Sequence, residues 1–186
     1  MALPESQRLT FADMQSWPED ERVELIDGIP VMQAAPARIH QLISRRLLFQ
    51  IGSFLEDKEC EIYYAPFAVR LFESSEDRPE DVDTVVEPDL VVVCDKEKLD
   101  DAGCKGAPDL IIEILSPSTQ RHDRMVKYNL YQRAGVERYW IVDPETKTVQ
   151  VCTLEDGLYG APQVYSRDDN IVMDNGCVVE LGRVFA

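Results

Sequence analysis

Two short runs of aliphatic and β-branched residues, 88–94 and 108–115, constrain the fold more than any other part of the sequence. Apolar runs of this length predict two buried strands of a β-sheet. The stretch between them is polar and contains Gly103 and Gly106, residues that allow the chain to reverse direction. We therefore expect the two runs to pair as antiparallel strands, in a register symmetric about Asp101.

This register places Asp89 directly opposite Glu113, and Cys94 opposite Pro108. Opposed residues of antiparallel strands point to the same face of the sheet, so the two carboxylates would lie side by side. Their mutual repulsion would be relieved by a hard cation with oxygen ligands, for which Mg²⁺ or Mn²⁺ is suited. Taken singly, each residue also has a purely structural interpretation: Asp89 could begin a strand, and Glu113 could face solvent.

The third candidate residue is Lys127, in a helix predicted over 119–134. On a helical wheel it shares the arc of Leu130, Tyr131 and Ala134, which should face the sheet. Burying an unpaired ammonium group is costly, so Lys127 should point at carboxylates or at a bound anion. Such a cation could stabilise the charge that develops during metal-assisted phosphodiester hydrolysis. Alternatively, its aliphatic stem could pass Leu130 and bring the ammonium group to solvent.

The remaining patterns predict one α/β domain, 1–186, with a central mixed sheet flanked by helices. Further helices are predicted over 10–17 and 36–56, and the 119–134 helix should end at Gly135. A strand–turn–strand unit is expected over 22–32, followed by a strand over 61–72 and a polar, mobile acidic loop over 73–83. The last part should contain strands over 138–142 and 148–154, with shorter ones near 164, 171 and 178.

Three other ionisable residues have simpler interpretations. His40 lies on the apolar stripe of the 36–56 helix, with Ile43, Leu47, Ile51 and Phe54, which favours a core histidine over a catalytic base. Asp123, one turn before Lys127, is a further site candidate, but it falls in the first turn of its helix, where the helix dipole alone can account for an acid. Glu24 alternates with apolar neighbours and is expected on the polar face of its strand.

The composition limits the classes of partner. A net charge of −16 argues against a broad basic surface, so an architectural nucleic-acid binder is excluded and any DNA contact should be local or require a partner protein. No apolar run approaches the roughly twenty residues of a membrane span, and no secretion signal is visible, so a cytoplasmic location is expected.

The five cysteines show no paired spacing, which favours free thiols in a reducing compartment. With only two histidines, a zinc site is not expected.

Several blocks of the sequence resemble the Uma-two family of restriction-endonuclease-like proteins. The resemblance runs from about residue 22 to 159 and is carried by VELIDGIPV, APFAVRLF, VVEPDLVVV, GAPDLIIEILSPST, DRMVKYNLYQRAGVERYWIVDP and VQVCTLEDGLY. It implies a restriction-endonuclease-like core of the PD-(D/E)xK type, with Asp89 in the PD element and Glu113 as the (D/E) residue. Leu115 stands where that motif has lysine. Similar families move this lysine to the following helix, where Lys127 stands.

The resemblance also implies further site residues and a function. The backbone carbonyl of Ile114 and the side chain of Glu24 would be additional metal ligands, and His40 matches a position where the family usually has histidine. The implied activity is Mg²⁺- or Mn²⁺-dependent endonucleolytic hydrolysis of DNA, by an enzyme that could act as a homodimer. The alternative is a catalytically silent nuclease-fold domain with a regulatory or protein-binding role, which the acidic composition and Leu115 favour.

Overall fold

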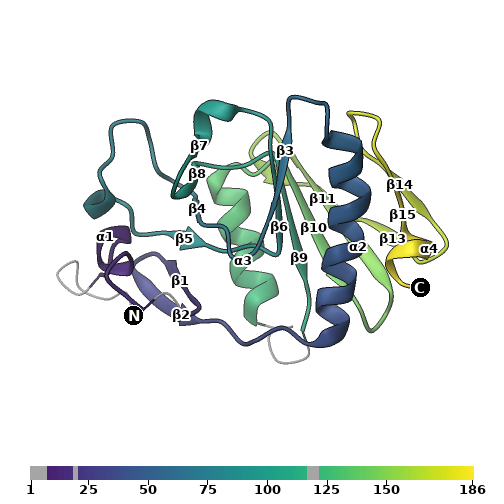
Figure 1. Ribbon diagram of the computed structural model, residues 1–186, viewed down its shortest axis with the longest axis horizontal. Helices are drawn as coiled ribbons and strands as arrows, with labels where there is room; N and C mark the ends of the chain where they lie inside the picture. The colour runs from purple at the N-terminus through teal and green to yellow at the C-terminus, as the bar shows by residue number, and fades with distance from the viewer. Residues whose placement is uncertain (1–7, 19–20, 117–121) are drawn as a thin grey trace.

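The computed structural model describes residues 8–18, 21–116 and 122–186, with the side chains of 122–124 left out (Figure 1). Its helices are α1 (Phe11–Met14), α2 (Arg38–Leu55), α3 (His122–Ala134) and α4 (Leu181–Val184), with single 3₁₀ turns η2 (Pro79–Asp81) and η3 (Lys96–Lys98). Helix α2 begins two residues after and ends one residue before the predicted bounds, and α3 ends at the predicted Ala134; the predicted start of α3 lies outside the described residues. None of the helices in these ranges combines the length and hydropathy that a bilayer-spanning segment needs.

The larger sheet has seven strands in the order β12-β11-β10-β9-β6-β3, with β13 also paired to β11. These strands are β3 (Glu61–Tyr64), β6 (Leu90–Val93), β9 (Leu110–Ile114), β10 (Arg138–Asp143), β11 (Thr148–Glu155), β12 (Leu158–Tyr159) and β13 (Gln163–Ser166). The neighbours β9 and β10 are parallel, because α3 connects them as a crossover, whereas β6 pairs with β9 antiparallel. The predicted mixed sheet flanked by helices is thus confirmed.

The predicted register between the two apolar runs is also confirmed. Leu90 pairs with Ile112, and Val92 with Leu110, which is the register symmetric about position 101. The connection, however, is not a simple hairpin loop. Its residues form η3 and two short strands, β7 (Leu99–Asp100) and β8 (Gly103–Lys105), which join a different sheet.

That second sheet has six strands in the order β2-β1-β5-β4-β8-β7. Its other members are β1 (Val23–Ile26), β2 (Ile29–Met32), β4 (Val69–Arg70) and β5 (Val85–Val86), and Figure 1 shows them at the left of the molecule, beside α3. The sequence patterns predicted the β1–β2 unit but not this second sheet, because β4, β5, β7 and β8 have only two or three residues, too few for alternation to reveal them. A third, two-stranded sheet pairs β14 (Asn170–Val172) with β15 (Val178–Glu180).

The second sheet also corrects two local predictions. Residues 61–72 are not one strand: β3 ends at Tyr64, and the chain crosses to the second sheet before β4 begins. The acidic segment 73–83 contains η2, and its Val82 is buried in a small apolar cluster with Phe11, Leu25 and Val85. The segment is therefore anchored by apolar burial near its end.

The larger sheet is covered on both faces, and alternate residues of β9 serve the two sides. Leu110, Ile112 and Ile114 join the core beneath α2, with that helix's Ile43, Leu47, Ile51 and Leu55. Leu55 takes the place predicted for Phe54, which is only half-buried. Ile111 and Leu115 join the core beneath α3, with Leu130 and Tyr131. Each fully buried aliphatic side chain contributes about 1.5–3 kcal/mol, so both helices are held firmly.

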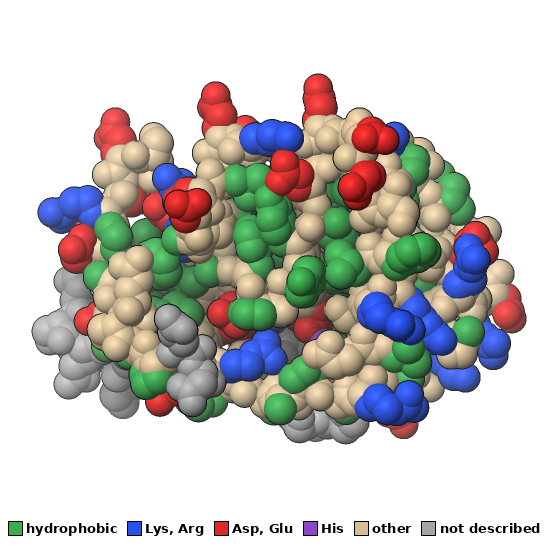
Figure 2. Space-filling model, in the orientation of Figure 1, with side chains coloured by type: hydrophobic (Ala, Val, Ile, Leu, Met, Phe, Trp, Pro, Cys, Tyr) green, Lys and Arg blue, Asp and Glu red, His purple; other side chains and the backbone are tan. Residues whose placement is uncertain are grey.

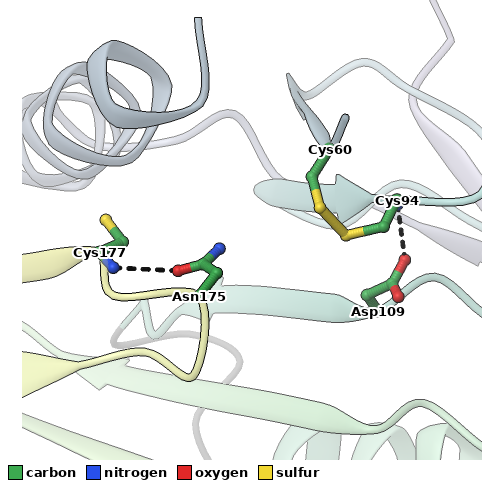
Figure 3. Close-up of a disulfide and its surroundings, with 5 residues drawn as sticks. All are labelled: Cys60, Cys94, Asp109, Asn175 and Cys177. Atoms are coloured by element: carbon green, nitrogen blue, oxygen red, sulfur yellow. Dashed lines mark hydrogen bonds between the residues drawn. A yellow bond between two sulfur atoms is a disulfide. The ribbon is translucent and has the colours of Figure 1, made fainter. Parts of the chain in front are cut away.

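The expectation of five free thiols is wrong for two of them. Cys60 and Cys94 form a disulfide, and Asp109 Oδ2 accepts a 2.7 Å hydrogen bond from the backbone N–H of Cys94 (Figure 3). The antiparallel pairing of Glu61 with Val93 brings the two cysteines together just beyond the strand pair. Cysteine spacing cannot reveal a contact that depends on strand register. The other three cysteines, Cys104, Cys152 and Cys177, are buried thiols.

Candidate active site

Glu113 occupies a position on β9 that would otherwise be apolar. Its neighbours on the same face, Ile111 and Leu115, are both buried beneath α3. Lys127 and Tyr131 lie one helical turn apart on α3, so both reach this carboxylate. Lys127 Nζ donates to Glu113 Oε1 at 2.8 Å, and the Tyr131 hydroxyl donates to the same oxygen at 2.7 Å. The prediction that Lys127 faces carboxylates is confirmed, and the solvent-directed alternative is wrong, since the residue is 8% exposed.

Glu24 completes the ion pair from the opposite side. It is fully buried on β1, and its Oε1 accepts a 2.8 Å hydrogen bond from Lys127 Nζ. The same oxygen accepts from the backbone N–H of Glu87 at 3.0 Å, and Gln33 Nε2 donates to Oε2 at 2.7 Å. The expectation that Glu24 lies on a polar strand face is wrong. Both faces of β1 are covered, because the second sheet packs beside α3.

Asp89 lies just before β6, at the end of the sheet where Glu113 lies. Its Oδ2 accepts a 2.7 Å hydrogen bond from the backbone N–H of Ile114 and lies 3.0 Å from His40 Nε2. His40 is buried in the first turn of α2, so it is both a core residue and a partner of Asp89. Its Nδ1 is buried and makes no hydrogen bond to any described group. Sequence reasoning foresaw the burial of His40 but not this contact.

Four of these residues line a cleft of about 70 Å³ at the ends of β6 and β9: His40, Asp89, Glu113 and Lys127. A water molecule needs roughly 10–15 Å³ by this measure, so the cleft has room for a few waters or a partly hydrated ion. Arg22 and Glu87 also line it, and their Nε and Oε2 atoms are buried without a hydrogen-bond partner among the described residues. The apolar Leu115 contributes to the wall.

The site carries more negative than positive charge. Burial, with repulsion from Asp89 and Glu24, raises the pKa of Glu113 to about 7 despite the attraction of Lys127. Burial alone would lower the pKa of Lys127, but Glu113 and Glu24 hold it well above its usual value. Burial also raises the pKa of Glu87. Lys127 therefore remains protonated. Its positive charge is outnumbered by the carboxylates around it, Glu24, Glu87, Asp89 and Glu113.

The donor set suits a hard divalent cation. Asp89 and Glu113 present carboxylate oxygens at the cleft, and Ile114, the residue expected to add a backbone carbonyl, also lines it. The buried Oε2 of Glu87 is a further oxygen without a partner among the described residues. Within that part of the chain, no group of three or more His, Cys, Asp or Glu side chains is placed to hold a metal ion. Mg²⁺ is commonly held by one or two carboxylates, with water and substrate phosphate completing its coordination.

Sequence reasoning missed Tyr131 and Glu87 as site residues. A signal existed for each: Tyr131 follows Lys127 by one helical turn, and Glu87 precedes Asp89 by two residues. The side chain of Asp123, a further predicted site residue, lies outside the described residues.

The mixed sheet has helices on both faces, and acidic residues and a lysine lie at one end of its central strands. This arrangement defines a restriction-endonuclease-like protein. The sequence matches the model of the Uma2 family, described as "Putative restriction endonuclease", over residues 10–181. The chain therefore belongs to the Uma2 family, a family of nuclease-like proteins.

Two known proteins are similar to this chain. The crystal structure of a "putative nuclease belonging to DUF820" from Anabaena variabilis has a TM-score of 0.74 and 18% identity, covering 95% of this chain and 97% of that one. It shows the same fold. The uncharacterised protein slr1290 of Synechocystis sp. is 27% identical over 126 residues, which are 67% of this chain and 62% of that protein. The match thus spans less than two thirds of the relative's length.

Proposed function

We propose that this protein is a Mg²⁺- or Mn²⁺-dependent endonuclease that hydrolyses phosphodiester bonds of DNA. The observation that carries the proposal is the placement of Lys127, 2.8 Å from Glu113, at a cleft that Asp89 also lines. A buried lysine beside acidic residues at the end of adjoining strands provides both a cation-binding set and an ammonium group for a phosphate.

Asp89, Glu113 and the carbonyl of Ile114 would hold the cation, with Glu24 a further candidate. When bound, a divalent cation lowers the pKa of a coordinated water and neutralises phosphate charge. His40 orients the Asp89 carboxylate through its 3.0 Å contact, and Tyr131 orients Glu113 through its hydroxyl. These positioning contacts hold the two carboxylates in place before substrate arrives.

Lys127 would take the part of the lysine that Leu115 replaces. An ammonium group has three N–H donors, of which Glu24 and Glu113 each accept one. The third donor has no partner among the described residues; donated to a phosphate oxygen, it would stabilise the negative charge that develops in the transition state. Because Glu24 also accepts a hydrogen bond from Lys127, the ammonium group is held between the two carboxylates.

The test is plasmid cleavage with Mg²⁺ and Mn²⁺, combined with metal titration by calorimetry. We expect Asp89→Asn and Glu113→Gln each to lower the cleavage rate by a factor on the order of 10² or more and to weaken metal binding. Glu155→Gln, which neutralises an exposed acid at the end of β11, is the matched control and should change neither. Equal metal affinity and equal rates in all four proteins would contradict the proposed site.

One observation favours the alternative of a catalytically silent domain. Lys127 already pairs with two carboxylates, so the ion pair could serve stability alone. A wild-type protein that cleaves no DNA, single- or double-stranded, with either metal would favour a regulatory or protein-binding role for this fold.

A further inference from the structure

Helix α2 differs sharply in charge from the rest of the chain. The protein carries a net charge of −16, with 35 acidic residues. None of these lies within Arg38–Leu55, although that helix carries the three arginines Arg38, Arg45 and Arg46. A cationic helix on an acidic protein is a local attraction for an anionic partner, on a molecule that otherwise repels one.

The arginines gather on the side of α2 that faces away from the sheet. Arg38, Arg45 and Phe49 are exposed and follow one another at intervals of seven and four residues, so they share one helical face. A groove of about 350 Å³ runs beside them, lined by Arg45, Arg46, Phe49, Gln50 and Arg183. Figure 2 shows Lys and Arg side chains collected over this part of the surface, from the lower end of α2 toward α4.

Arg38 and Arg45 make no ion pair with any carboxylate in the described ranges. Their neighbours have other partners: Arg46 donates to the carbonyls of Val184 and Ala186 at 3.1 and 2.6 Å, and Arg183 pairs with Glu180 at 3.3 Å. Arg38 and Arg45 thus keep all their N–H donors available for an external anion.

The helix itself reaches the candidate active site, from its buried side and at its N-terminal end. His40, which contacts Asp89, lies on the same helix between Arg38 and Arg45. At about 1.5 Å per residue, the two arginines are separated by roughly 10 Å along the helix. Phosphates of one DNA strand rise by about 3.4 Å along the duplex axis per nucleotide and also wind around it, so arginines this far apart can each contact a different phosphate.

We propose that this face of α2 binds the phosphate backbone of the DNA that the active site cleaves, with Arg38 and Arg45 contacting two phosphates. The proposal rests on the proposed function for the identity of the substrate. It explains how a chain of such negative charge can hold DNA: the contact is confined to one helix, and the acidic remainder of the surface stays clear.

The test is binding of a short fluorescent duplex, measured by anisotropy in EDTA so that no cleavage occurs, as a function of salt concentration. Each phosphate contact contributes about −0.9 to the slope of log affinity against log salt. The double variant Arg38→Gln with Arg45→Gln should therefore lose about two from the magnitude of that slope. At roughly 0.1 M salt the same relation corresponds to about 50-fold weaker binding.

Two further variants make the result specific. The double variant Arg38→Lys with Arg45→Lys keeps the charge and should retain most of the slope. Arg78→Gln removes an exposed arginine that pairs with Asp81 next to η2, away from the site, and should leave binding unchanged. Because all three arginines are exposed, the melting temperature should be the same in every variant.

An unchanged slope in the double glutamine variant, an equal loss in Arg78→Gln, or no duplex binding by the wild type would overturn the proposal. So would a loss of binding to phosphatidylserine vesicles without a loss of DNA binding. DNA binding through these arginines without cleavage in Mn²⁺ would support it while counting against the proposed nuclease activity. If the wild type cleaves DNA but the salt slope is the same with and without these arginines, the proposed binding face is overturned and the proposed nuclease activity is not.

Discussion

Replacing Lys127 with methionine should destabilise the metal-free protein strongly, although the side chain keeps its length and packing. The ammonium group is the shared partner of Glu24, which is fully buried, and of Glu113, whose side chain is 13% exposed. Breaking a buried ion pair by removing one partner costs about 3–5 kcal/mol, because the remaining charge is left without compensation. Since whole domains are stable by about 5–15 kcal/mol, this loss would be a large fraction of the total.

The loss should also depend on pH. The pKa of Glu113 is raised to about 7, so protonation can relieve the excess negative charge at lower pH. The effect of Lys127→Met on the free energy of unfolding should therefore be largest above pH 7 and should shrink toward pH 5. Adding Glu24→Gln to the same variant removes one of the stranded charges and should recover part of the stability.

The assay is urea unfolding followed by the fluorescence of Trp140, which is 1% exposed in the folded protein. Lys96→Met is the matched control, because Lys96 pairs with Glu61 at the surface with its side chain 61% exposed, and it should change stability by less than about 1 kcal/mol. A Lys127→Met protein as stable as this control at pH 8 would refute the ion-pair argument. That result would mean that water or a rearrangement of the site stabilises the negative charges of Glu24 and Glu113 in the absence of the ammonium group.

Three more predictions concern stability. Because the folded pKa of Glu113 is above its usual value, the metal-free protein should lose stability as pH rises from about 4.5 to 7, and thermal melts of Glu113→Gln should lack this component. Tyr131→Phe removes a buried donor to Glu113, so denaturant titration should show a loss of about 1–3 kcal/mol, whereas an unchanged midpoint would contradict the contact. The Cys60–Cys94 bond closes a loop with a sequence separation of 34, so reduction should cost about 3–4 kcal/mol in the wild type and nothing in Cys60→Ser.

The sequence alone determined the parts of this protein that follow from local pattern. Two apolar runs lie on either side of a polar segment in which the chain can reverse direction. This pattern determined the register of β6 against β9, and with it the closeness of Asp89 and Glu113. The 3.6-residue period of α3 determined that Lys127 faces the sheet. These inferences succeed because side-chain direction in a strand or helix depends on position within that element, whatever the rest of the fold does.

Tertiary structure decided which distant residues meet Lys127 and Asp89. Glu24 lies 103 positions from Lys127 in the chain and reaches it only because short strands assemble a second sheet beside α3. His40 reaches Asp89 because the first turn of α2 lies beside the residue that precedes β6, and Cys60 reaches Cys94 because β3 pairs with the same strand. The residue pattern within one helix or strand does not reveal which other element packs against it. That pairing depends on how the apolar faces of all the helices and sheets are buried together. The sequence could therefore identify the ionisable residues of the candidate site. Only tertiary packing decided that two of the carboxylates pair with the same ammonium group, that of Lys127.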